Sequence, residues 1–290
     1  MTALLPQALK RRIGPLPQWS AVALRRSPQE VVRVQMRGAQ GGIDVTHAAV
    51  VAALSPLTLA VGLDDTARAA LGDCSGPDLR FVDVESGRTV GALQLLKVRD
   101  SLTPAAPIAL FEVRGATQHC VRWPYAPWNR YLQNRAIRRH RARPDNFWMP
   151  PEAVQQLMIF YILPRQVVLV SVEDGGHRNL FPMDLIGPVA PDCFTLALRS
   201  TSRSVPAMKS ARRVLLSDVA AADRGLAYRL GVHHREPLAD WQSLPCATAR
   251  LPAFSLPFPQ SALRLRELEI LDFETIGSHA LFVTRIAAEQ

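Results

Sequence analysis

Short runs of aliphatic and β-branched residues recur along the chain, separated by glycine or proline turns. They predict strands at Val31–Met36, Leu57–Val61, Leu79–Val84, Val90–Val98, Ile108–Val113, Gln166–Val172, Phe194–Leu198, Val214–Ser217, Leu268–Phe273 and Ala280–Ile286. Helical spacing of apolar residues is confined to Glu152–Ile162 and to Ala220–Leu230, which stops at a glycine. We therefore expect a mainly β fold with a few helices, in which short strands curl into closed or half-closed barrels.

The two halves of the chain share an order of features. Val31–Val34 aligns with Val167–Val170, and a glycine turn follows both runs. A proline precedes a predicted strand in each half, at Pro56 and Pro191. A later strand ends in Asp-Val in each half, at Asp83-Val84 and Asp218-Val219. Each half then has a glycine and a histidine before an apolar strand, Gly115 with His119 and Gly277 with His279. This order predicts two tandem, barrel-like halves that mimic a two-fold dimer within one chain. The alternative is a chance likeness between two β-rich segments.

Basic residues concentrate in two segments. Residues 1–26 carry five Lys and Arg, and residues 129–143 carry six arginines, with no acidic residue in either segment. Pro150-Pro151 follows the second segment and marks a boundary. We expect a β-rich domain at 1–128, a degenerate copy of the second, then an Arg-rich linker at 129–151 and a barrel at 152–290. The linker is either a solvated connector or an arm for nucleic acid or another anionic surface.

The cysteines favour a reducing compartment. Cys74, Cys120, Cys193 and Cys246 stand far apart in sequence, which is not the spacing of a zinc or redox pair. Met1–Gly14 lacks the apolar core of a signal peptide, and no apolar run is long enough to cross a membrane. We expect a cytoplasmic protein with reduced thiols.

An ordered set of motifs in the second half resembles a known family. After the strand ending at Val172 comes His177-Arg-Asn-Leu-Phe-Pro-Met183, then Pro191–Leu198, then Arg199-Ser-Thr-Ser-Arg-Ser204, and finally Ile276-Gly-Ser-His279. In this order, the motifs resemble the flavin reductase-like domain, an FMN-binding split β-barrel, over about residues 155–286. The resemblance implies bound FMN and a nicotinamide cofactor, NADH or NADPH, as a transient substrate.

The same motifs supply the candidate cofactor site. In the resembled family the segment matching Asn179, Leu180, Phe181, Pro182 and Met183 lies along the flavin ring. Ser200, Thr201, Ser202 and Ser204 precede a probable helix at Val205–Ala211, where hydroxyls and free N–H groups form a phosphate cradle. Arg199 and Arg203 add positive charge there. The alternative is a polar surface loop with a serine cap.

His279 is the candidate catalytic residue. It matches the family histidine near the nicotinamide and flavin face. The flavin carries the hydride chemistry, so we assign His279 a positioning role. Asp174, Asp184 and the adjacent His233-His234 are interpreted as structural, and we expect no metal site.

The first half lacks the serine-rich turn. Asp64-Asp65 stands there instead, and two acids would repel a phosphate. This predicts one flavin per chain, walled by the first half, with Trp123 and Trp128 as candidates for the wall. The chain would work as a homodimer or as a monomeric pseudo-dimer on a small-molecule substrate.

The main hypothesis is an NAD(P)H-dependent flavin reductase. The alternatives are a non-catalytic flavin-binding protein, and a nucleic-acid or anionic-surface binder that uses the Arg-rich linker. The last of these predicts salt-dependent binding and no chromophore.

Overall fold

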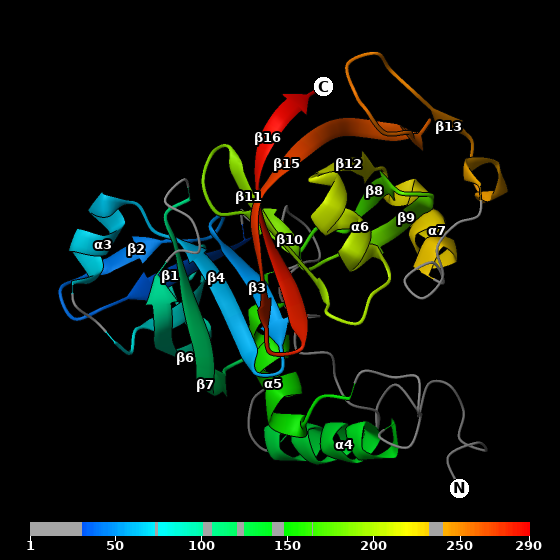
Figure 1. Cartoon of the computed structure of the whole chain (residues 1–290). Coiled ribbons are helices and arrows are strands. Elements are labelled where there is room, and N and C mark those ends of the chain that lie inside the picture. The colour runs from blue at the N-terminus through cyan, green and yellow to red at the C-terminus, as the bar shows by residue number, and fades with distance from the viewer. Residues whose placement is uncertain are drawn as a thin grey trace, which may run out of the picture.

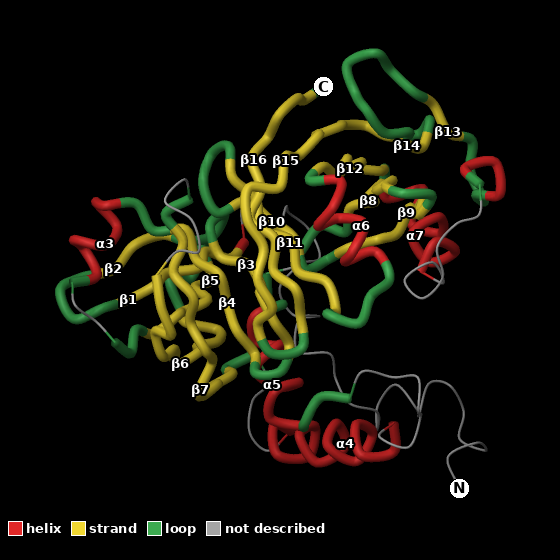
Figure 2. The backbone as a smooth tube through the Cα atoms, in the orientation of Figure 1, coloured by secondary structure: helices red, strands yellow, loops and turns green. Residues whose placement is uncertain are grey.

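A computed structural model describes residues 31–72, 75–100, 106–120, 125–140, 148–163, 165–231 and 240–290. These residues form a mostly β structure with two curled sheets (Figures 1 and 2). Among them, no helix has the length and apolar character needed to cross a membrane. The predictions for Cys74, Trp123 and His233-His234 lie outside the described residues.

The first sheet is built from the first half of the chain and is antiparallel throughout. Its order is β2-β1-β5-β6-β7-β4-β3. The strands are β1 (Val32–Arg37), β2 (Gly42–Asp44), β3 (Ala49–Leu54), β4 (Leu57–Gly62), β5 (Asp78–Asp83), β6 (Thr89–Asp100) and β7 (Ile108–Gln118). Valine, leucine and phenylalanine side chains alternate into its buried face along β1 and β5, as expected for strands covered on one side.

The second sheet is built from the second half in the same way. Its order is β10-β11-β16-β15-β12-β8-β9. The strands are β8 (Val168–Asp174), β9 (His177–Met183), β10 (Ile186–Pro188), β11 (Cys193–Arg199), β12 (Arg213–Val219), β15 (Ala262–Ile276) and β16 (His279–Glu289). Gly175 and Gly176 both have positive φ, which lets the chain make the tight turn between β8 and β9.

The two sheets match strand for strand. Replacing β1, β2, β3, β4, β5, β6 and β7 by β8, β9, β10, β11, β12, β15 and β16 converts one order into the other. The prolines and the Asp-Val pairs noted in the sequence fall at matching places, before β4 and β11 and at the ends of β5 and β12. The observed topology is therefore consistent with tandem halves.

The histidine pairs do not match between the halves. Gly277 and His279 come directly before and at the start of β16, whereas Gly115 lies inside β7 and His119 follows that strand. The residue that corresponds to His279 at the start of β7 is Ile108. That part of the predicted alignment was wrong, because a glycine beside an apolar run can belong to either end of a strand.

Helices connect and cover the sheets. They are α3 (Asp65–Leu71), α4 (Tyr125–His140), α5 (Pro151–Phe160), α6 (Ser204–Ala211) and α7 (Arg224–Leu230), with short turns η3 (Ala221–Asp223) and η5 (Trp241–Ser243). The helices α3 and α6 follow the matching strands β4 and β11. Residues 129–140 of the Arg-rich segment lie in the helix α4, and residues 141–147 lie outside the described residues. The helix α4 lies at the lower edge of Figure 1, outside both sheets, and contacts α5.

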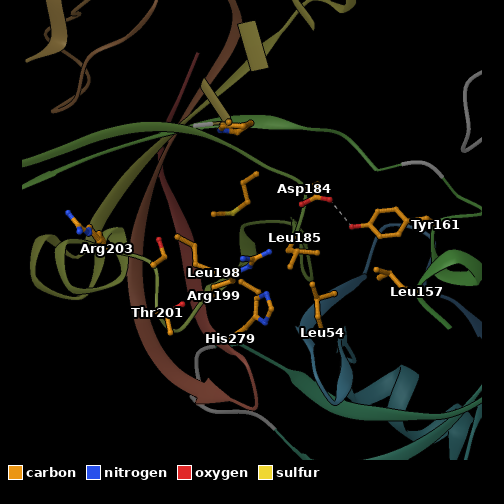
Figure 3. A pocket seen from close by; sticks show the side chains of 15 residues that line it. Leu54, Leu157, Tyr161, Asp184, Leu185, Leu198, Arg199, Thr201, Arg203 and His279 are labelled. Atoms are coloured by element: carbon orange, nitrogen blue, oxygen red, sulfur yellow. Dashed lines mark hydrogen bonds between the residues drawn. The ribbon is translucent and has the colours of Figure 1, made fainter. Parts of the chain in front are cut away.

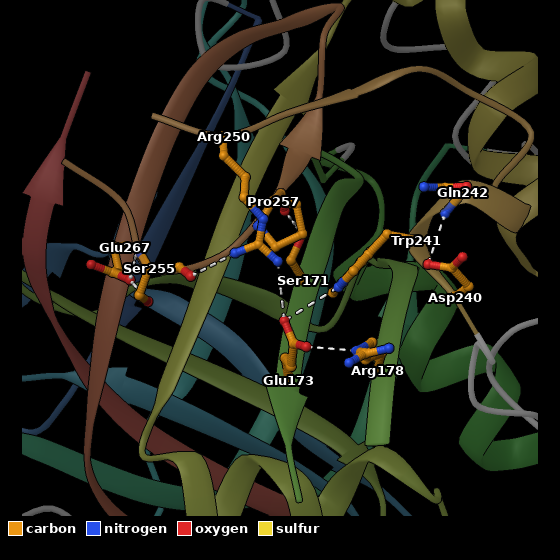
Figure 4. A network of polar contacts seen from close by, with 10 residues as sticks. All are labelled: Ser171, Glu173, Arg178, Asp240, Trp241, Gln242, Arg250, Ser255, Pro257 and Glu267. Carbon is orange, nitrogen blue, oxygen red and sulfur yellow. Dashed lines mark hydrogen bonds and ion pairs between the residues drawn. The ribbon is translucent and has the colours of Figure 1, made fainter. Parts of the chain in front are cut away.

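A segment between α7 and β15 is held on the second sheet by polar contacts (Figure 4). It includes η5 and the small ribbon β13 (Thr248–Ala249) with β14 (Phe258–Pro259). Glu173 on β8 accepts from Arg178 Nε at 2.6 Å and from Trp241 Nε1 at 3.2 Å, and Arg250 pairs with the same carboxylate. Ser171 donates to the carbonyl of Pro257 at 2.7 Å. These contacts fix the segment that buries one side of α7.

One hydrophobic cluster spans the two halves. Buried residues of β3, β4 and β7 form a single cluster with Leu185, Val189, Cys193, Ala197 and Leu281 from the second half. β3 contacts β10, β11 and β16 directly. Glycines permit this close approach: a Cβ on Gly62 would lie 1.6 Å from the Val189 carbonyl oxygen, and one on Gly187 would lie 2.9 Å from Val50 Cγ2.

We therefore expect Gly62→Ala to destabilise the whole chain. The added methyl has no space unless the β10–β11 turn moves away, and overpacking of this kind costs about 2 kcal/mol or more. Gly76→Ala serves as the control, because its Cβ would meet only the Leu95 carbonyl oxygen at 3.5 Å, an ordinary contact. The measurement is the free energy of unfolding in urea. An equal, small effect of both substitutions would contradict the tight contact between halves.

Candidate functional site

A pocket of about 540 Å³ lies where the two halves meet beside α6. The second half supplies Pro182 to Leu185 from the end of β9 and the following turn, and Ala197 to Arg199 from the end of β11. Thr201 to Arg203 come from the loop before α6, and His279 from the first position of β16. We call this cavity the main pocket. Its volume is in the range of small-molecule sites.

The remaining walls come from elsewhere in the chain. Leu54, at the end of β3, reaches the main pocket from the first half. Leu157 and Tyr161 reach it from the end of α5, and Gly231 from the end of α7. The Tyr161 hydroxyl donates to Asp184 Oδ2 at 3.1 Å. Burial, followed by the charge of Asp184, raises the pKa of the Tyr161 phenol, so it remains protonated.

Charges are separated along the main pocket (Figure 3). Arg203 and Thr201 lie at one side, and the Tyr161–Asp184 pair lies at the other, with Leu198, Arg199 and His279 between them. One side of the pocket is therefore cationic and rich in hydroxyl groups, and the other ends in a carboxylate. Such a cavity suits an elongated ligand with an anionic end and a planar, hydrogen-bonding body.

His279 is 2% exposed and is held by the turn that precedes it. Ser278 Oγ lies 2.8 Å from His279 Nδ1 and also accepts from the Ser55 N–H at 3.1 Å. Ser278 Oγ donates to Nδ1 when the ring proton lies on Nε2, and accepts from Nδ1 when the proton lies there. Burial, followed by the positive charge of Arg199, lowers the pKa of His279 to about 4. The imidazole is therefore neutral near pH 7.

The predicted phosphate loop divides into two groups. Thr201, Ser202 and Arg203 line the main pocket, as does Arg199. Ser200 instead bonds to the Ser278 carbonyl through both its N–H and its hydroxyl. Ser204 is buried and accepts from Asn179 Nδ2 at 2.8 Å. The hydroxyls of Ser200 and Ser204 therefore fasten the loop to the sheet.

The predicted ring-binding segment also divides. Pro182 and Met183 line the main pocket. Asn179 bonds to Ser204, Phe181 lies in the core of the second half, and Leu180 packs against α7 and Trp241 on the opposite face. The segment is a strand, β9, so its side chains alternate between faces and only its end reaches the cavity.

Several pocket residues were missed in the sequence. Asp184 was interpreted as structural, although its position directly after Met183 was a usable signal. Tyr161 and Leu157 stand four apart on the predicted helix, which placed them on one face without saying what they faced. No sequence pattern could have placed Leu54 in the main pocket, because only the packing of the two halves brings it to that cavity. Trp128, one of the predicted wall residues, is not a lining residue of the pocket and is 52% exposed on α4.

A second pocket, of about 830 Å³, lies at the matching position of the first half. It is lined by the β2–β3 connection, the end of β4, the start of α3 and Pro107 before β7, with the β10–β11 turn entering from the second half. Here Asp64 caps α3, since its side chain accepts from the Ala67 N–H at 2.7 Å. The N-cap of α6, Arg203, makes no side-chain cap bond. Of these two matching helix starts, the one at α3 is therefore capped by a carboxylate and the one at α6 is not.

Comparisons with known proteins concern the fold. The sequence matches no protein-family model and no curated protein. In structure, 43% of the chain is similar to 71% of an FMN-binding protein from Thermus thermophilus, with 22% identity and a TM-score of 0.38. It is likewise similar to 79% of BorF, the flavin reductase component of a bacterial two-component tryptophan halogenase, with 18% identity and a TM-score of 0.39. For the styrene monooxygenase flavin reductase of Pseudomonas putida S12, 43% of this chain matches 79% of that one, with 18% identity and a TM-score of 0.37. These likenesses are to split-barrel proteins of the flavin reductase type.

We expect the buried His279 to make stability depend on pH. The unfolded chain takes up the proton near pH 6.5, whereas the folded chain resists it until about pH 4. Protonation therefore favours unfolding, and stability falls as the pH drops through this window. From about pH 7 to about pH 4 the loss due to His279 is about 3 kcal/mol.

His279→Gln removes this loss, and the measurement is urea unfolding of both proteins at the two pH values. The control is His47→Gln, at an exposed position. A pH dependence that is the same in the His279→Gln variant and the unchanged protein would contradict the assignment.

Proposed function

We propose that the chain binds one FMN in the main pocket and works as an NAD(P)H-dependent flavin reductase. The observation that carries the proposal is the joining, in one cavity, of Arg199, Arg203, Thr201 and Ser202 beside a helix start without a carboxylate cap, an apolar middle, and a neutral buried His279. This combination suits a ring system that carries a phosphate. The motif resemblance noted in the sequence points to the same ligand.

The residues fit FMN in the following way. Arg203 and Arg199 would pair with the phosphate, and the hydroxyls of Thr201 and Ser202 would donate to it. Met183, Leu198 and Leu54 would contact the ring and exclude water. When bound, FMN supplies the hydride-accepting chemistry. His279 stays neutral, so it would orient rings by hydrogen bonding and would not deliver a proton.

The matching cavity of the first half supports a ratio of one FMN per chain. The Asp64 carboxylate occupies the helix start that a phosphate would need. The first half would then replace the partner subunit of a dimer, contributing Leu54 to the site. We propose that the protein acts in the cytoplasm on a small-molecule substrate, as a pseudo-dimer within one chain or as a dimer of such chains. Among the described residues, Cys120, Cys193 and Cys246 form no disulfide.

The test is an absorption spectrum of the chain with FMN, recorded without oxygen before and after adding NADH or NADPH. We expect bound-flavin bands that bleach. Bands that persist would support the non-catalytic flavin-binding alternative, and an absence of FMN binding would overturn the proposal. We expect Arg203→Gln to weaken FMN about 10- to 100-fold, the loss of a charged hydrogen bond, but to leave riboflavin unaffected. Arg213→Gln, at the exposed start of β12, is the control.

A second candidate function rests on α4. One face of α4 carries two aromatic and two basic side chains, all exposed: Trp128, Tyr131, Arg135 and Arg138. They share this face because they are spaced by three or four residues. The two rings stack with centroids 5.7 Å apart. The apolar Leu132 and Ile137 are half-buried on other faces. Rings in line with guanidinium groups suit single-stranded nucleic acid, whereas a bilayer would need a continuous apolar face.

For this candidate we expect the chain to bind a labelled oligothymidylate of about 20 nucleotides, with affinity that falls steeply as salt rises. The paired substitution Arg135→Gln and Arg138→Gln should flatten the salt dependence, and Arg213→Gln with Arg264→Gln is the charge-matched control. Fluorescence anisotropy measures both. If the α4 variant and the control variant bind the oligothymidylate with equal affinity, α4 is excluded as the binding surface.

A further inference from the structure

A third cavity, of about 560 Å³, adjoins the main pocket. Pro182, Met183, Asp184 and Gly231 line both cavities, so one short segment of chain and the end of α7 form their common wall. We call the third cavity the side pocket. It lies between the end of β12, the start of β8 and α7. A ligand there would lie beside whatever occupies the main pocket.

One face of α7 forms the outer wall of the side pocket. Arg224, Ala227, Tyr228 and Gly231 line it, at the spacing of residues that share a helix face. The opposite side of α7 is anchored, because Leu226 and Leu230 pack with Trp241 in a buried cluster. Trp241 is in turn fixed by Glu173 (Figure 4). The orientation of α7 toward the cavity is therefore set by its packing.

The lining of the side pocket combines apolar surface, one aromatic ring, one cation and the carboxylate of Asp184, which accepts from the Tyr161 hydroxyl. Val167, Met183 and Val219 supply aliphatic walls. Tyr228 is 83% exposed, more than any other large hydrophobic side chain in the described ranges. Arg224 is exposed and makes no ion pair within the part of the chain that the structure describes. An exposed ring beside an unpaired guanidinium fits a planar aromatic ligand with an acidic group.

We propose that the side pocket binds a planar aromatic anion, which is the second substrate of the proposed reductase. This inference rests on the proposed function for the role of the ligand, but the binding site itself stands on the geometry of α7. Tyr228 stacks on the aromatic ring, and Arg224 pairs with its acidic group. The shared wall of Pro182 to Asp184 holds the ligand next to the main pocket without overlap.

The test uses the fluorescent probe 8-anilinonaphthalene-1-sulfonate and its uncharged parent N-phenyl-1-naphthylamine, titrated into the full chain with and without FMN. We expect Arg224→Gln to weaken the sulfonate about tenfold and to leave the uncharged compound unchanged. Tyr228→Ser should weaken both about tenfold. Arg213→Gln and Leu263→Ser, an exposed cation and an exposed aliphatic residue away from the cavity, are the matched controls. Circular dichroism confirms that each variant folds.

The outcomes separate the two proposals. Sulfonate affinity that is the same in the α7 variants and the controls would overturn the side pocket. So would displacement of the probe by one equivalent of FMN, because the two ligands would then share one site. A third outcome is that the chain does not bind FMN, whereas Arg224→Gln weakens its affinity for the sulfonate. That outcome would overturn the proposed function and support the side pocket.

Discussion

The packing of β3 against β10, β11 and β16 is the contact on which the main pocket depends. It joins the two sheets through a shared hydrophobic cluster and places Leu54 at the edge of the cavity. The same approach brings the β3–β4 turn to the β15–β16 turn, where Ser278 bonds to Ser55 through both its N–H and its hydroxyl. Ser278 then positions the imidazole of His279. The pocket is therefore built from both halves, and its histidine is held from the other half.

The two halves repeat a topology but differ at the equivalent helix starts. After β4 the chain places Asp64, whose carboxylate caps α3 with its own negative charge. After β11 it places Thr201, Ser202 and Arg203, and the start of α6 is bonded by the Ser202 hydroxyl, which accepts from the Ser204 N–H, and not by a carboxylate. A carboxylate and a phosphate compete for the same helix end, since both are anions attracted by unpaired N–H groups. The difference of a few residues thus turns a symmetrical scaffold into an asymmetrical one.

The connection between the halves contributes to the site as well. The helix α5 follows the Arg-rich α4 and ends at the main pocket, where Tyr161 bonds to Asp184. Asp184 stands in the wall common to the main and side pockets. Its carboxylate lies away from Arg203, so the field along the cavity runs from positive to negative. Such a polarity would orient the FMN proposed for this cavity, with its phosphate toward Arg203.

The sequence alone determined the strands with strong apolar character, the helix over α5, the turn at Gly175-Gly176 and the loop before α6. These features depend on local periodicity and on residues with particular backbone preferences. It did not determine β2, β3 or β10, because β2 and β10 are short and β3 is a uniformly apolar run at the contact between halves. Nor did it separate Pro182 and Met183, which line the cavity, from Leu180 and Phe181, which do not. From the sequence we could single out the loop before α6 and His279, which line the main pocket. Tertiary structure alone decided which side chains face that cavity, because this depends on how two sheets distant in sequence pack together.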